Sequence, residues 1–159
     1  MRALKVPGKS GPADIILFVR KKLAIEDYQA LAQFRRGIRG YIRFSERVVR
    51  NANLEPRQYQ LLLALKGLPR EVSPRIAEFA QQLQIQHQSA VELVDRLEQR
   101  NLVRRERGTT DRREVLVRIT PAGEELIAGL AMAHLREVFS HGPTMLKDLQ
   151  AVLHRSRPL

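Results

Sequence analysis

The sequence predicts a mainly α-helical protein with a small β-hairpin, an α+β fold of one domain with extensions. Apolar residues recur at three- and four-residue spacing along most of the 159 residues, which indicates amphipathic helices. The period changes to two between residues 102 and 120, which indicates two short strands. The chain has no Trp and only 5% aromatic residues, so we expect a core of Leu, Ile, Val and Ala, as in packed helices.

The N-terminal third is expected to hold an arm, a short helix and one long helix. Residues 1–12 mix Pro, Gly and Lys without periodicity, which is typical of a flexible arm. A short helix is expected from Asp14 to about Leu23, and a long one from about Glu26 to Asn51. A helix of about 25 residues is long for a small domain, and spanning a subunit interface is a natural use for it. Arginines occupy much of the helix circumference outside its apolar face, namely Arg36, Arg39, Arg43, Arg47 and Arg50.

Three shorter helices are expected in the middle of the chain. Proline is tolerated in a first turn, so Pro56 marks the start of the first helix, and Pro74 that of the second, with Ser73 as its N-cap. After a short break, the third helix begins near His87 and runs to about Arg100. Its opening turn is polar, whereas its later apolar residues form one stripe.

The last third is expected to contain the hairpin and two more helices. A turn at residues 108–111 joins the two strands. Thr120 is the expected N-cap of a helix that ends near Ser140, because the Gly-Pro pair at residues 142–143 interrupts it. A final helix is expected over residues 144–154.

The order helix, helix, helix, strand, turn, strand is that of a winged helix-turn-helix, in which the last of the three helices lies in the major groove of DNA. Gln88 is suited to pair with adenine, Ser89 with several base edges, and Val91 with a thymine methyl group. A polar first turn is equally typical of a solvated helix start. The candidate base-reading residues are Gln86, His87, Gln88, Ser89, Val91 and Glu92.

The expected hairpin concentrates arginine with few acidic residues. A solvated hairpin seldom does so, whereas the negative potential of a minor groove attracts arginine. The hairpin therefore favours the DNA-binding interpretation. Its arginines are Arg104, Arg105, Arg107, Arg112 and Arg113.

The net charge and the missing motifs narrow the function further. The charge of +11 suits a polyanionic partner, although solubility alone also explains it. The absence of Cys excludes disulfides and thiolate zinc sites, and without a His and carboxylate cluster we expect no metal site. No nucleophile elbow, phosphate-binding loop or metalloprotease motif occurs, so we expect no enzyme and no cofactor. The apolar run at residues 15–19 is too short to span a membrane, so we expect a soluble, cytoplasmic protein without a membrane partner.

Two stretches at matching spacing resemble MarR-type transcriptional regulators. They are residues 93–103, LVDRLEQRNLV, and residues 111–123, DRREVLVRITPAG, and the resemblance extends over about residues 27–154. It implies a homodimer, joined through N- and C-terminal helices, that binds a pseudo-palindromic operator in double-stranded DNA. The expected segments are an arm at 1–12, N-terminal dimerisation helices at 13–51, the DNA-binding region at 52–120 and C-terminal dimerisation helices at 121–159.

The resemblance also assigns roles to residues. The wing aspartate of the family holds an arginine that reaches the minor groove, and these roles fall on Asp111 and Arg113; a charged hydrogen bond of this kind fixes a mobile side chain. Arg96 is implied to contact phosphate or to brace the wing through Asp95 or Asp111, and a local Asp95–Arg96 ion pair is the alternative. Many relatives carry a basic or small polar residue where this chain has Glu92.

The same resemblance implies a small aromatic or phenolic effector, bound between the dimerisation helices and the DNA-binding region. We therefore expect a ligand-responsive bacterial repressor. A DNA-binding architectural protein without ligand response, or a basic helical protein-interaction module, remains an alternative. The candidate pocket residues, which are ordinary core residues on the alternative interpretation, are Phe34, Ile38, Tyr41, Tyr59 and Leu62.

Overall fold

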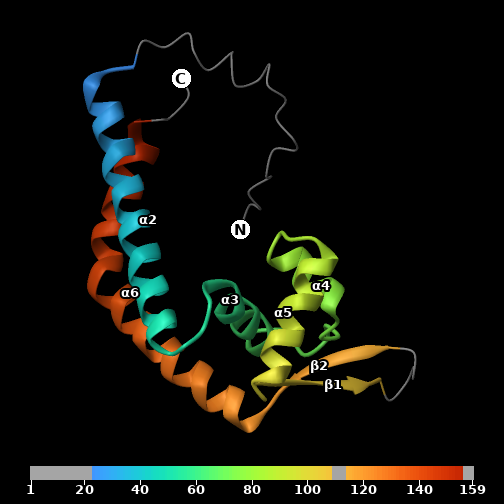
Figure 1. The fold of residues 1–159 in the computed structure, drawn as a ribbon. Helices are drawn as coiled ribbons and strands as arrows, with labels where there is room; N and C mark the ends of the chain where they lie inside the picture. The colour runs from blue at the N-terminus through green and yellow to red at the C-terminus, as the bar shows by residue number, and fades with distance from the viewer. Residues whose placement is uncertain (1–22, 109–113, 156–159) are drawn as a thin grey trace, which may run out of the picture.

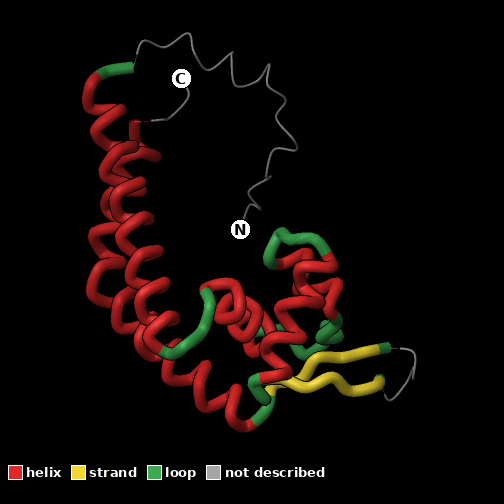
Figure 2. The backbone as a smooth tube through the Cα atoms, in the orientation of Figure 1, coloured by secondary structure: helices red, strands yellow, loops and turns green. Residues whose placement is uncertain are grey.

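The computed structural model describes residues 23–108 and 114–155, and it shows two parts, a long helical leg and a compact unit beside it (Figure 1). The leg consists of two helices that run side by side, α2 and α6. The unit consists of three short helices and an antiparallel hairpin, drawn as yellow strands in Figure 2. The elements are α2 (Ile25–Asn51), α3 (Pro56–Lys66), α4 (Ile76–Gln82), α5 (His87–Gln99), β1 (Val103–Arg107), β2 (Val115–Ile119) and α6 (Pro121–Arg155).

Most of these elements confirm the expectations from sequence. The long helix begins and ends within about a residue of the predicted positions, and Pro56 is the first residue of α3, as expected. The strands pair in the register that places Val103 opposite Ile119 and Arg107 opposite Val115. The helix expected at residues 14–23 lies almost wholly outside the described residues. Within the described ranges, none of the helices combines the length and the apolar character that crossing a bilayer requires.

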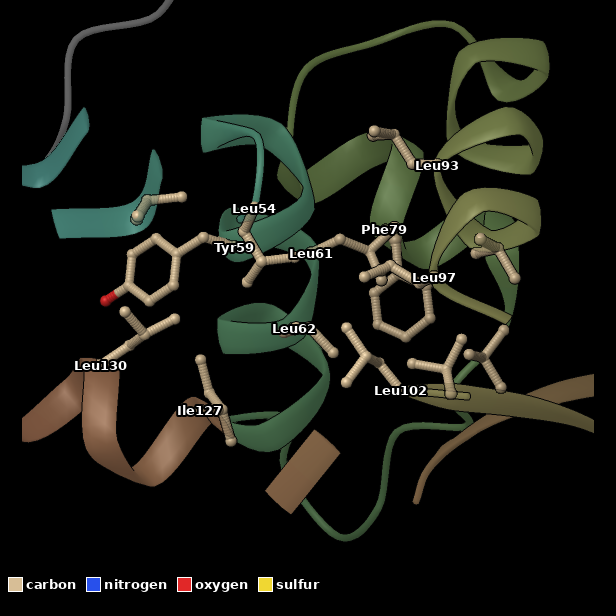
Figure 3. Close-up of a cluster of buried hydrophobic side chains, with 14 residues drawn as sticks. Leu54, Tyr59, Leu61, Leu62, Phe79, Leu93, Leu97, Leu102, Ile127 and Leu130 are labelled. Carbon is tan, nitrogen blue, oxygen red and sulfur yellow. The ribbon is translucent and has the colours of Figure 1, made fainter. Parts of the chain in front are cut away.

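The core of the compact unit forms around α3 (Figure 3). Leu61 and Leu62 are completely buried, and Phe79 of α4 and Leu97 of α5 pack against them from the other helices. Ile127 of α6 closes the cluster from the side of the leg. This shared core fixes α5 and the hairpin relative to the leg, because buried side chains in a close-packed interior leave little freedom to shift.

The start of α6 is held tightly against the hairpin. Thr120 is the N-cap, as expected, and its Oγ1 accepts a hydrogen bond from the backbone N–H of Gly123 at 3.1 Å. A Cβ atom on Gly123 would lie 2.1 Å from the carbonyl oxygen of Leu102, which is far inside contact distance. Glycine is therefore required at this position, because only a residue without a side chain lets α6 approach the backbone so closely.

A buried histidine joins the leg to the compact unit. The ring of His134 on α6 stacks on Tyr59 of α3, with centroids 4.5 Å apart. Its Nδ1 lies 2.7 Å from the Leu130 carbonyl oxygen, and its Nε2 lies 2.9 Å from Ser45 Oγ on α2. Because a carbonyl oxygen only accepts, Nδ1 carries a proton and donates to it. One side chain thus contacts three helices.

The predicted start of α4 is wrong. Ser73 and Pro74 do not open this helix, which begins at Ile76 with Arg75 as N-cap. The Pro74 carbonyl instead accepts a hydrogen bond from Val117 N–H at 2.8 Å, and Arg75 forms an isolated bridge with Leu116. The segment is extended because it pairs with β2, a tertiary contact that local capping preferences do not reveal.

The predicted break at residues 142–143 is also wrong, because α6 continues through Pro143 to Arg155. A proline removes one backbone hydrogen bond and normally kinks or ends a helix. Here α2 runs alongside the second half of α6, and a Cβ atom on Gly37 would lie 3.2 Å from Met145 Cγ. Packing beyond the proline therefore offsets the local cost.

Candidate nucleic-acid interface

The opening turn of α5 is presented at the surface by a tight helix-turn-helix connection. The N–H of Ile85 donates to the Ala80 carbonyl at 3.0 Å, and Gln84 adopts a positive φ of 53° within the turn. The polar residues predicted to read bases lie here, at the start of a helix whose opposite face is buried in the core. Exposed among them are Gln86, His87, Gln88 and Glu92, whereas Ser89 and Val91 are half-buried.

The hairpin lies beside α5 and is held there by Arg105 of β1. Its Nη2 lies 2.6 Å from Asp95 Oδ1, its Nη1 pairs with Glu98, and its backbone N–H donates to Glu98 Oε1 at 2.8 Å. Burial lowers the pKa of Arg105, but the hydrogen bonds and charges of the two carboxylates outweigh that effect and raise the pKa overall. Arg105 therefore acts as a brace between wing and helix in this structure, and its guanidinium is occupied within the protein.

The far side of α5 is held by two further arginines. Arg96 Nη1 lies 3.5 Å from Glu55 Oε2, and Arg100 donates to the carbonyl of Asn53. Asp95, one of the two partners expected for Arg96, pairs with Arg105, and Arg96 lies near Glu55 in the turn between α2 and α3. The other expected partner, Asp111, lies outside the described residues. The sequence offers one signal for this arrangement, since Asp95 and Glu98 are three residues apart and share a helix face.

The remaining wing arginines divide into two groups. Arg104 and Arg107 are exposed on β1, where Arg104 Nε lies 2.7 Å from Glu106 Oε1. Asp111, Arg112 and Arg113 lie outside the described residues. At the base of the wing, Arg75 pairs with Glu114, a contact that sequence reasoning missed because Arg75 was assigned to a helix.

The structure separates the residues predicted to line a ligand pocket. Tyr59 and Leu62 are buried in the core, and burial, with a smaller contribution from Tyr41, raises the pKa of Tyr59 to about 12. Phe34 and Ile38 are half-buried on α2. A cavity of about 650 Å³ does lie between α2 and α6, and of the five candidates it has only Tyr41 in its lining. Its other lining residues include Arg36, Gly40, Arg43, His141, Met145 and Asp148.

Sequence comparisons find a family model and a curated relative that each match part of the chain. The sequence model of the MarR family matches residues 52–114. The HTH-type transcriptional repressor MdtR of Bacillus subtilis (strain 168) is 33% identical over 72 residues, which cover 43% of this chain and 46% of MdtR. The chain therefore aligns with just under half of the length of this curated relative.

Solved structures of similar fold cover more of the chain. AbsC, a MarR family transcriptional regulator from Streptomyces coelicolor, is similar with a TM-score of 0.66 and 23% identity, over 82% of this chain and 88% of AbsC. A mutant of S. aureus MepR bound to an oligodeoxyribonucleotide is similar with a TM-score of 0.60 and 16% identity, over 86% of this chain and all of that one. At such identities the likeness establishes the fold, with the leg included.

Proposed function

We propose that this chain, which the sequence model of the MarR family matches over residues 52–114, is a DNA-binding transcriptional repressor that acts as a homodimer. The observation that carries the proposal is the pairing of an exposed, polar α5 start with a hairpin locked to the same helix by Arg105. A helix in the major groove with a wing beside it is the arrangement by which this fold class contacts a duplex.

In the proposed complex, base reading falls to the first turns of α5. Gln88 presents both an amide donor and a carbonyl acceptor, which suits adenine, and exposed Glu92 is suited to accept from cytosine N4. Gln86, His87, Ser89 and Val91 complete the surface that enters the groove. Arg96 is exposed, and its ion pair with Glu55 is long, at 3.5 Å. Arg96 is therefore free to contact a phosphate.

We propose that the wing contacts the DNA backbone and the minor groove next to the major groove in which α5 lies. We assign this role to Arg104, which is exposed, and the roles of Asp111, Arg112 and Arg113 rest on the sequence resemblance. We assign Arg105 to positioning the wing, because its guanidinium already binds two carboxylates. Preorganised placement lowers the entropy that an arginine-rich loop loses on binding.

We propose the dimer because α6 carries an exposed apolar stripe. Phe139 is 77% exposed at its centre, and the stripe extends over most of the helix. Contiguous exposed apolar surface of this kind marks a protein interface. A second copy is the natural occupant, because two α5 helices set about 34–36 Å apart fit successive major grooves of an inverted repeat. The stripe consists of Met132, Leu135, Phe139, Leu146 and Leu153.

We further propose that a small effector with an aromatic or phenolic body regulates the repressor. The cavity between α2 and α6 supports this part of the proposal, since Tyr41 and Met145 give it apolar walls and charged side chains of both signs line it as well. These charged side chains are Arg36, Arg43, Glu137 and Asp148. A ligand there would change the packing of the leg and so the separation of the two α5 helices, provided that it binds one arrangement more tightly than the other.

Footprinting on genomic DNA tests the proposed function. A repressor of this kind protects discrete sites, each an inverted repeat, at protein concentrations well below those that coat the whole duplex. Uniform weak protection would contradict it and favour an architectural protein, and no protection at moderate salt would favour a protein-interaction module.

A further inference from the structure

The outer side of α2 carries a row of five arginines, of which the proposed function uses only the two that line the cavity, Arg36 and Arg43. Arg36, Arg39, Arg43, Arg47 and Arg50, here called the arginine row, are spaced by three or four residues, so they share one face of the helix. All five side chains are exposed. The row is about 21 Å long at ~1.5 Å per residue.

Most of the arginine row lies on the side of α2 that faces away from α6. Gly37 and Ser45 contact α6, and Val49 is completely buried, which places the packed face of α2 at these positions. Most of the row falls on the other side of the helix, and Arg36 and Arg43 also line the cavity between α2 and α6. The guanidinium of Arg47 rests above the Phe44 ring, 5.9 Å from its centroid.

Packing alone does not explain the arginine row. Like charges three and four residues apart repel each other along a helix. In the described part of the chain, one member has a carboxylate partner, Arg50 with Glu46 at 3.6 Å, and both of those side chains are exposed. A helix that only had to cover a core would be more stable with acidic residues at some of these positions, so the row indicates an anionic partner.

The chemistry of the row favours nucleic acid over protein. The core of a protein interface is depleted of charge and anchored by aromatic or apolar side chains, whereas the row consists of charged side chains. Nucleic-acid interfaces are polar, wet and strongly positive, and a duplex carries one negative charge per about 1.7 Å of its axis. A second copy of this chain has the same positive row and does not fit it.

The row and the α5 surface belong to different parts of the molecule. The row lies on the leg, whereas the hairpin extends away from the leg on the far side of the compact unit (Figure 1). We propose that the arginine row is a second, sequence-independent surface for duplex DNA, which holds a segment other than the one at α5. A bound dimer would then bridge two duplex segments.

The test uses the full chain immobilised through a terminal tag. A labelled duplex of unrelated sequence, about 30 base pairs long, is titrated at about 50 mM salt, before and after α5 is saturated with an unlabelled duplex selected by the protein. We expect the wild type to bind the labelled duplex in both conditions. The variant R39Q/R47Q/R50Q, which spares the two arginines of the cavity, should bind it at least tenfold more weakly after saturation, with a salt slope reduced by about 0.9 per arginine.

A matched variant, R70Q/R136Q/K147Q, removes the same charge from exposed residues outside the row and should bind as the wild type does. Both variants should keep the wild-type circular dichroism and the affinity for the selected duplex. Equal binding of the labelled duplex by wild type and row variant would overturn the proposal, and so would equal losses in the two variants. Row-dependent binding of poly-glutamate without binding of duplex would overturn it in favour of an acidic protein partner. A chain that selects no duplex would contradict the proposed function alone, because the unrelated duplex still reports on the row.

Discussion

Two arginines that are neighbours in sequence, Arg104 and Arg105, have different partners. Successive residues of a strand face opposite sides of a sheet, so Arg105 is directed at α5 and Arg104 at solvent. Composition alone treats them as equal members of a basic hairpin. The alternation of the strand, together with Asp95 and Glu98 on one face of α5, is the feature of the sequence that distinguishes them.

The brace predicts unequal effects of one substitution at these neighbouring positions. Arg105→Gln should lower the free energy of unfolding by about 1–2 kcal/mol, because hydrogen bonds to two carboxylates are lost at a side chain that is three-quarters buried. Arg104→Gln should change it by less than about 0.5 kcal/mol, since its ion pair with Glu106 is exposed. Urea unfolding of both variants measures the difference, and equal midpoints would exclude the brace.

Base reading by α5 makes a prediction about Gln88. Gln88→Ala should cost about 1–3 kcal/mol for the selected sequence, because a bidentate contact to one base is lost. Its binding to random duplex should stay near the wild-type level, since phosphate contacts carry no sequence information. Competition titrations with selected and random duplexes give both values. If the two affinities fall in step, Gln88 does not read a base.

Whole elements follow from the sequence where the signal is local. The periodicity of α2 and α5 and the alternation of the hairpin are local properties, and these elements appear where they are expected. The two prolines at residues 74 and 143 were misjudged because their outcome depends on distant partners, β2 for one and α2 for the other. Local rules correctly describe how a proline disfavours helix, but tertiary packing decides whether other contacts offset that unfavourable free energy.

The junction between β1 and α6 predicts opposite effects for two glycines of one helix. Gly123→Ala should destabilise the protein by about 1–3 kcal/mol, because the new Cβ atom overlaps the Leu102 carbonyl. Gly129→Ala meets no atom within 4 Å and should stabilise it by about 0.5–1 kcal/mol through better helix propensity. Thermal unfolding compares them, and an Ala at 123 that leaves the melting temperature unchanged would contradict the close approach.

The whole molecule depends on a second copy for its proposed function. The sequence indicated an interface through the length of α2, and the structure adds the exposed stripe of α6, which no local pattern separates from a core-facing stripe. The same reasoning applies to the ligand residues. Helical spacing groups Phe34, Tyr41 and Tyr59 as apolar, but only three-dimensional packing determines that Tyr59 is covered by His134.

The stripe predicts that one added charge dissociates the dimer. Phe139→Glu should give a folded monomer, because the carboxylate is solvated in the separate protomer and unpaired in the interface. Ala151→Glu adds the same charge at an exposed position off the stripe and should remain dimeric. Sedimentation equilibrium distinguishes the two, and a dimeric Phe139→Glu protein would place the interface elsewhere.

Selection from a pool of random duplexes tests the central claim most directly, namely that two copies of α5 read adjacent turns of one duplex. The account predicts enrichment of an inverted repeat whose half-sites are about 10–10.5 base pairs apart from centre to centre. Enrichment of a single unrepeated site, or no enrichment over the starting pool, would contradict it.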